Sequence, residues 1–195
     1  MRDSNARRDH LAALLSTHTP SSPAEVAHRQ AMLELAQVEG DPFHRDHFQP
    51  GHYTASAFVL SPDRSALLLI FHGKLHRWLQ PGGHFEPEDL DVFAAARREV
   101  AEETGIADVS LVGDGLLDVD VHEIPARKGD PAHLHFDARV LFQAGSWDFE
   151  AGSDAKDARW VPLAEMDGVD SDESVRRAVS RLVGGQAPSG RSSAG

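Results

Sequence analysis

Two stretches near the start of the chain have the hydrophobic spacing of amphipathic helices. The first runs from Ala6 to His18, and its apolar side chains recur at helical intervals, at Leu11, Leu14 and Leu15. The second begins at Pro23, where Ser22 can cap the helix and Glu25 completes the capping-box arrangement. Residues 1–49 are therefore expected to form a helical N-terminal extension. Its apolar stripe must cover either the main domain or a second copy of the chain, which leaves a homodimer open.

The middle of the chain has the alternation and the β-branched composition of strands. Strands are predicted at residues 53–60 and 66–72, joined by SPDRS, at 116–124 and 132–142, joined by PARKGDP, and at 158–162. Helices are predicted at 91–104, ended by Gly105, and at 172–183, and Pro81-Gly82-Gly83 is predicted to be a loop. The pattern indicates one α/β domain over residues 50–184. The polar residues 185–195 are expected to be a disordered tail.

Charge and composition narrow the classes of function. The chain has 31 acidic and 19 basic residues, a formal net charge of −12, which argues against binding duplex nucleic acid or an anionic membrane surface. Cysteine is absent, which excludes disulfides, thiolate zinc sites and cysteine nucleophiles. No apolar run approaches the roughly 20 residues of a spanning helix, and the charged start lacks an apolar signal region. The cytoplasm is therefore the expected location.

The densest chemistry lies on the helix predicted at 91–104. Glu99, Glu102 and Glu103 stand at positions i, i+3 and i+4, so their carboxylates share one face and repel one another. Arg98 can offset part of this repulsion through its i+4 relation to Glu102. A hard divalent cation with oxygen ligands, Mg²⁺ or Mn²⁺, is the natural neutraliser. The alternative is an ordinary solvated face of exposed glutamates.

The sequence around these acids resembles the Nudix box, whose pattern is G-x5-E-x7-R-E-U-x-E-E-x-G-U with U an aliphatic residue. The segment RREVAEETGI fills the second half completely, and PGGHFEPED precedes it. The first half differs, because Asp89 stands six positions after Gly83 in place of a glutamate, and eight residues rather than seven separate it from Arg98. An extra residue in the loop ahead of the helix leaves the helix face unchanged.

The resemblance implies a Nudix α/β/α sandwich, with a mixed β-sheet between helices, and hydrolysis of a diphosphate linkage in a nucleoside diphosphate derivative or a similar small molecule. It implies metal ligands at Glu99, Glu102, Glu103 and the Gly83 carbonyl, and a catalytic set of Arg98, Glu99 and Glu102. Arg98 would hold the carboxylates in place, and Glu99 would take the proton from water. Glu150 and Asp154 are alternative acids for that step. A Nudix-like sensor that binds a nucleotide metabolite without cleaving it is the alternative function.

Two later strands carry polar residues on alternate positions, and the polar residues of each strand share one face: Asp118, Asp120 and His122 on one, and His133, His135, Asp137 and Arg139 on the other. If the strands pair, they form one polar surface, which either is a solvated sheet face or lines the substrate cleft. In the cleft, the imidazoles would contact phosphate or sugar, or would bind a softer metal. The candidate substrate-binding residues are His84, His122, His133, His135 and Arg127, with Lys128 beside Arg127 as a further cation.

Overall fold

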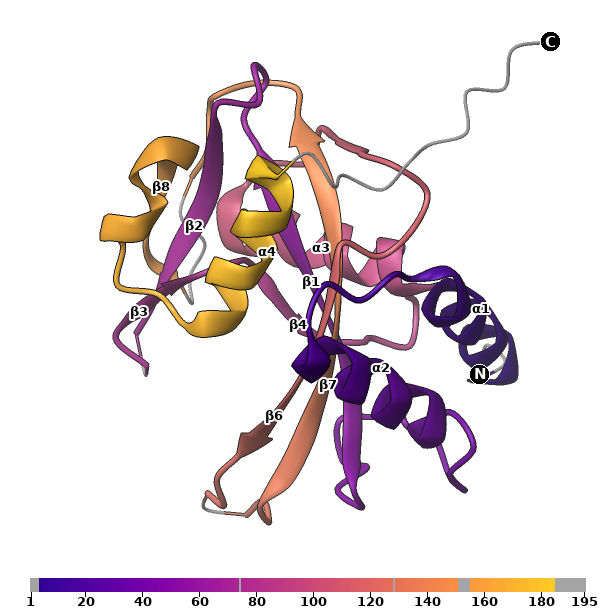
Figure 1. Cartoon of the computed structure of the whole chain (residues 1–195). Coiled ribbons are helices and arrows are strands. Elements are labelled where there is room, and N and C mark those ends of the chain that lie inside the picture. Colours follow the sequence, from indigo (N-terminus) through magenta and orange to yellow (C-terminus); the bar gives the residue numbers. More distant parts are fainter. Residues whose placement is uncertain (1–3, 74, 128, 151–154, 185–195) are drawn as a thin grey trace, which may run out of the picture.

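The computed structural model describes residues 4–73, 75–127, 129–150 and 155–184 (Figure 1). The helices are α1 (Ser4–Thr17), α2 (Pro23–Leu35), α3 (Val92–Thr104) and α4 (Glu173–Val183), with a 3-10 helix η1 (Leu163–Gly168) before α4. The strands are β1 (Gly51–Leu60), β2 (Ala66–His72), β3 (Arg77–Leu79), β4 (Gly82–His84), β5 (Val109–Leu111), β6 (Asp118–Ile124), β7 (His133–Ala144) and β8 (Ala155–Pro162). None of the helices described is long and apolar enough to cross a bilayer.

The long strands β1 and β7 form the centre of a mixed sheet. They pair in parallel over their whole shared length, from Gly51 opposite Leu134 to Leu60 opposite Gln143. The remaining pairings are antiparallel: β1 with β2 and β4, β7 with β5 and β6, and β2 with β3 and β8. β4 pairs with β1 at Thr54–Ser56 and β2 pairs with it at Val59–Leu60, so two different strands follow one another along β1.

Successive residues of β1 point to opposite faces of the sheet and so enter different cores. Tyr53, Ala55 and Ala57 belong to the core beneath α1, α2 and α3, whereas Phe58 and Leu60 belong to the core beneath η1 and α4. Figure 1 shows α3 and α4 on either side of the two long strands. The predicted α/β/α sandwich with a mixed sheet is therefore confirmed.

The N-terminal helices pack on the chain's own sheet. The Tyr53 hydroxyl donates to the Met32 carbonyl at 2.6 Å, and leucines of α1 join the same core. Ser22 accepts the predicted capping hydrogen bond from the Glu25 amide at 3.2 Å. The Glu25 carboxylate does not complete the capping box on Ser22 but is buried, where Arg181 of α4 donates to it at 3.1 Å. The apolar stripe therefore covers the main domain.

The loop predicted at Pro81-Gly82-Gly83 is wrong, because Gly82–His84 form the strand β4. Gly82 pairs with Ser56 and Gly83 with Ala55 of β1. A Cβ atom at Gly82 would clash with Ser56, so the pairing depends on glycine. Short strands such as β3 and β5, of three residues each, carry too little periodicity to be predicted. The predicted tail, residues 185–195, lies outside the described residues.

Candidate functional site

The helix α3 presents its acidic residues on the face turned away from the core. Its N-terminus is capped by Asp91, whose carboxylate accepts from the Ala94 amide at 2.9 Å. It ends at Gly105, whose φ of 69° is the left-handed conformation that glycine adopts at helix ends. Val92 and Val100 are buried beneath the helix. The predicted acidic face is thereby formed by Glu99, Glu102 and Glu103.

Arg98 ties these acids to the preceding segment. Its Nη1 donates to Glu99 at 2.9 Å and to Glu102 at 3.0 Å, so the expected i+4 pair with Glu102 forms. Its Nη2 donates to Asp89 at 2.9 Å and to the His84 carbonyl at 2.7 Å. One guanidinium therefore fixes two carboxylates of α3 and connects them to β4 and to the loop before the helix.

The two glycines of β4 bring its backbone against the same carboxylates. The Gly82 amide donates to Oε2 of Glu103 at 2.9 Å. A Cβ atom placed on Gly83 would stand 2.5 Å from Oε1 of Glu99. The absence of a side chain at Gly83 thus leaves room for the Glu99 carboxylate, which is a requirement that sequence spacing alone does not reveal.

The carboxylates of Glu99, Glu102 and Glu103, set against the backbone of Gly82 and Gly83, form a carboxylate cradle. This cradle suits a hard divalent cation. Its donors are carboxylate oxygens next to a peptide backbone, and Mg²⁺ and Mn²⁺ prefer oxygen ligands. Burial raises the pKa of Glu99, and Arg98 offsets only part of that effect. A bound cation would favour the ionised form. The Glu102 side chain is 59% exposed, so this edge of the site faces solvent.

The polar faces of β6 and β7 do form one surface, with His122 opposite His135 and Asp120 opposite Asp137. The interpretation as a solvated sheet face is wrong, because most of the surface is buried. The buried Arg139 pairs with Asp137 at 2.8 Å and with Asp118 at 3.2 Å. Asp118 is also bound at 2.7 Å by Arg177 from α4, the helix that covers this face. The acids here are neutralised by arginines of the protein itself.

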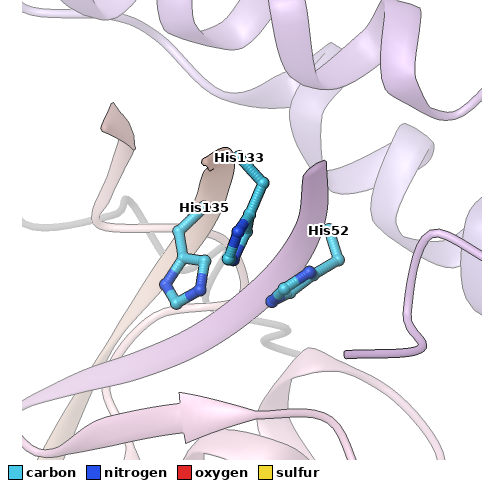
Figure 2. A group of neighbouring side chains, drawn as sticks. All are labelled: His52, His133 and His135. Atoms are coloured by element: carbon cyan, nitrogen blue, oxygen red, sulfur yellow. The ribbon is translucent and has the colours of Figure 1, made fainter. Parts of the chain in front are cut away.

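At one end of this surface the histidines converge (Figure 2). His52, His133 and His135 each place a ring nitrogen within 4.8 Å of the others. Within the part of the chain that the structure describes, no other three His, Asp or Glu ligand atoms come so close, the three glutamates of α3 included. Sequence reasoning missed His52, because the strand was predicted to begin at residue 53. The alternation of His52, Thr54 and Ser56 was the signal available.

Two of these histidines have strongly lowered pKa values. Burial, followed by repulsion from His84, lowers the pKa of His52 to about 4. Burial, followed by repulsion from His52 and the other imidazoles, lowers the pKa of His135 to about 2. Both rings are therefore neutral near pH 7 and can accept a hydrogen bond or a cation through one nitrogen.

The remaining predicted residues fall at different distances from these two clusters. His84 joins the histidines, with its ring 5.0 Å from that of His52, and follows the Gly83 that meets Glu99. His122 lies at the exposed edge of the histidine cluster, with its ring centroid 5.6 Å from that of His135. Arg127 is exposed in the turn between β6 and β7, where its backbone pairs with Asp130.

Of the two alternative acids, Glu150 is exposed at the end of α3. Its amide donates to the Thr104 carbonyl at 2.8 Å, and its Cβ lies close to Gly105. Asp154 and Lys128 lie outside the described residues. Glu150 is therefore the distal acid whose position relative to α3 is defined.

A mixed sheet between helical layers, with a glutamate-bearing helix set against a glycine strand, defines the Nudix class of fold. The family model described as NUDIX domain matches residues 50–182. The chain therefore belongs to the NUDIX domain family, and its assignment as a Nudix-type pyrophosphohydrolase rests on that membership. A comparison with curated protein sequences gives no match.

Solved structures show the same fold. A NUDIX-family hydrolase from Clostridium perfringens is 23% identical, with a TM-score of 0.50, and the match covers 67% of this chain and 97% of that one. The Nudix hydrolase RenU from M. smegmatis is 16% identical, with a TM-score of 0.52, and the match covers 69% of this chain and 85% of that one. At these identities the likeness supports the fold and not a substrate.

Proposed function

We propose that the protein is a divalent-metal-dependent hydrolase that cleaves the diphosphate linkage of a nucleoside diphosphate derivative or a similar small molecule. The observation that carries the proposal is the packing of Glu99 and Glu103 against the glycine pair of β4, with Arg98 holding Glu99 and Glu102. A chain of net charge −12 needs cations to bind a polyanionic substrate at a carboxylate site.

Glu99, Glu102, Glu103 and the Gly83 carbonyl are the proposed ligands of Mg²⁺ or Mn²⁺. When bound, the cation neutralises the diphosphate, polarises its phosphoryl oxygens and acidifies a water. The role of Arg98 is to position carboxylates, because its donors are already engaged with Asp89, Glu99, Glu102 and the His84 carbonyl. Arg98 therefore acts through the carboxylates that it holds, and not by contacting the substrate.

Glu99 is the proposed acceptor of the proton from the attacking water. It lies within the cradle, where Arg98 donates to its carboxylate at 2.9 Å and Gly83 leaves room for it. Glu150, exposed beside the end of α3, is the alternative.

His84, His122 and Arg127 are the proposed contacts to the rest of the substrate. A cysteine-free, acidic chain is what we expect of a cytoplasmic enzyme.

The experiment is a panel of nucleoside diphosphate derivatives, incubated with the protein and Mg²⁺, with the products identified by mass. Release of a nucleoside monophosphate and a second phosphate-bearing product, abolished by EDTA, supports the proposal. Tight binding of a panel member without turnover favours the sensor function and contradicts hydrolysis. Hydrolysis in H₂¹⁸O identifies the phosphorus that is attacked, because that product gains the label.

A further inference from the structure

The histidine cluster has the geometry of a second metal site, made of different ligands from the first. His52 comes from β1, and His133 and His135 come from the adjacent parallel strand β7, where His52 lies in register with His135. The three ring centroids are 4.7–5.3 Å apart. Figure 2 shows the rings side by side on one face of the two strands.

The outer nitrogens of two of these rings are held by backbone carbonyls. Nδ1 of His133 lies 2.8 Å from the Pro131 carbonyl, and Nδ1 of His52 lies 3.3 Å from the His47 carbonyl. A carbonyl only accepts, so in the neutral rings the proton is assigned to Nδ1 and the lone pair to Nε2. Histidines that bind metals are commonly oriented in this way.

The inner nitrogen of His52 lacks a partner in the part of the chain that is described. Its Nε2 is buried without a hydrogen bond, and the residue is 1% exposed. A buried polar atom is normally satisfied, and an unsatisfied one calls for a physical explanation. A cation bound between the rings would supply the missing partner.

We propose that His52, His133 and His135 bind a transition-metal cation of the Zn²⁺ class through their ring nitrogens, with the fourth position taken by water or by a ligand oxygen. Three imidazoles offer no carboxylate oxygen, so the donor set favours Zn²⁺ over Mg²⁺ or Mn²⁺. Zn–N bonds of about 2.1 Å in a tetrahedral site put the nitrogens about 3.4 Å apart. The present separations are up to 4.8 Å, so binding requires the imidazole side chains to rotate towards one another.

This site borders the carboxylate cradle but is separate from it. The ring of His84 lies 5.2 Å from that of His135, while the His84 carbonyl accepts from Arg98 at 2.7 Å. His135 and His84 are partly exposed, which provides a route for the ion. A metal here also links β1 to β7, so its binding stabilises the folded chain.

The test uses the full chain without a histidine tag, stripped with a chelator and kept in excess Mg²⁺ so that the carboxylates are occupied. Zn²⁺ is titrated by calorimetry, and Co²⁺ is added as an optical probe of a four-coordinate nitrogen site. We expect one Zn²⁺ per chain with a Kd below about 1 μM, a higher Tm, and a visible Co²⁺ spectrum. His135→Ala should weaken Zn²⁺ binding by at least about 100-fold.

Three further variants make the result decisive. His133→Ala, checked for folding by circular dichroism, should behave as His135→Ala does. His44→Ala, an exposed histidine paired with Asp46, should bind Zn²⁺ as the wild type does. Glu99→Gln combined with Glu102→Gln should also keep Zn²⁺ binding, which separates this site from the proposed hydrolytic one. No Zn²⁺ bound by the wild type, unchanged binding by His135→Ala, or loss of Zn²⁺ in the glutamate variant would overturn the proposal.

Discussion

Asp89 accepts hydrogen bonds from Arg98 through both of its oxygens, from Nε at 3.2 and 3.3 Å and from Nη2 at 2.9 Å. Asp89 also accepts from the Glu86 amide at 2.8 Å and is buried. The segment before α3 is one residue longer than the Nudix pattern, yet the loop places an acid against the box arginine. The loop absorbs the insertion, and the helix face keeps its geometry.

The Asp89–Arg98 pair should matter for both stability and turnover. Asp89→Asn keeps the shape of the side chain but removes the charge that pairs with Arg98. We expect a loss of about 2 kcal/mol in the free energy of unfolding and a roughly 10-fold lower kcat. Urea denaturation and steady-state kinetics measure these effects. Asp114→Asn, at an exposed position, is the control and should change neither. Equal kinetics for the two variants would show that Asp89 does not position Arg98.

Replacing Gly83 should impair turnover without impairing folding. In Gly83→Ala the new methyl group meets the flexible end of Glu99, so the carboxylate must move while the backbone stays in place. We expect kcat to fall at least about 10-fold with little change in Tm. Gly115→Ala, where a Cβ atom meets nothing within 4 Å, is the matched control. A Gly83→Ala enzyme with wild-type kcat would show that the position of Glu99 is not critical.

Glu102 should contribute through its charge. Glu102→Gln retains the length of the side chain and, because this side chain is 59% exposed, should leave folding intact. We expect kcat/KM to drop at least about 100-fold in Mg²⁺. Glu88→Gln replaces an exposed glutamate of the preceding loop and should behave as the wild type. Unchanged turnover in Glu102→Gln would remove it from the ligand set.

Glu25 should make the stability of the fold depend on pH in the acid range. Burial raises its pKa, but hydrogen bonds from His18 and Ser21 and the charge of Arg181 outweigh burial and lower the pKa from 4.5 to about 2. A carboxyl whose pKa is lower in the folded state stabilises the fold fully above pH 4.5. That contribution is lost as the pH falls from 4.5 towards 2.

The comparison of wild type with Glu25→Gln isolates this contribution. At pH 7 the variant should lose about 3 kcal/mol in the free energy of unfolding, since Arg181 keeps a buried charge without its partner. The difference between the two proteins should shrink as the pH drops below 4.5. Chemical denaturation at several pH values measures it. A difference that stays constant from pH 7 to pH 3 would mean that the Glu25 carboxyl is not the titrating group.

The sequence predicted most of the long elements because their determinants are local. The cap at Asp91 and the left-handed Gly105 flank α3 (Val92–Thr104) directly, and the apolar positions Val92, Ala96 and Val100 lie within it. The strand β4 was missed because its formation depends on the fit of Gly82 against Ser56, 26 positions away in the chain. No local pattern contains that contact.

The same distinction between local patterns and contacts made only in the folded chain explains which parts of the site the sequence predicted. The acidic face of α3 follows from helical spacing, so its residues were found from sequence. The burial of Asp118, Asp137 and Arg139 depends on α4, which brings Arg177 over the sheet. His52 joins His135 only through the parallel register of β1 and β7. A single sequence shows which residues alternate on a strand, but not which helix covers that strand or which neighbour lies beside it.

Mn²⁺ binding followed by EPR tests the central claim most directly, with His135→Ala as the background so that the histidine cluster does not contribute. We expect this protein to bind Mn²⁺ and to lose at least about 100-fold in affinity when Glu99→Gln and Glu102→Gln are added, since ligand charge sets the affinity for hard cations. Equal Mn²⁺ affinity with and without the two glutamate substitutions would contradict the claim that these carboxylates hold the metal.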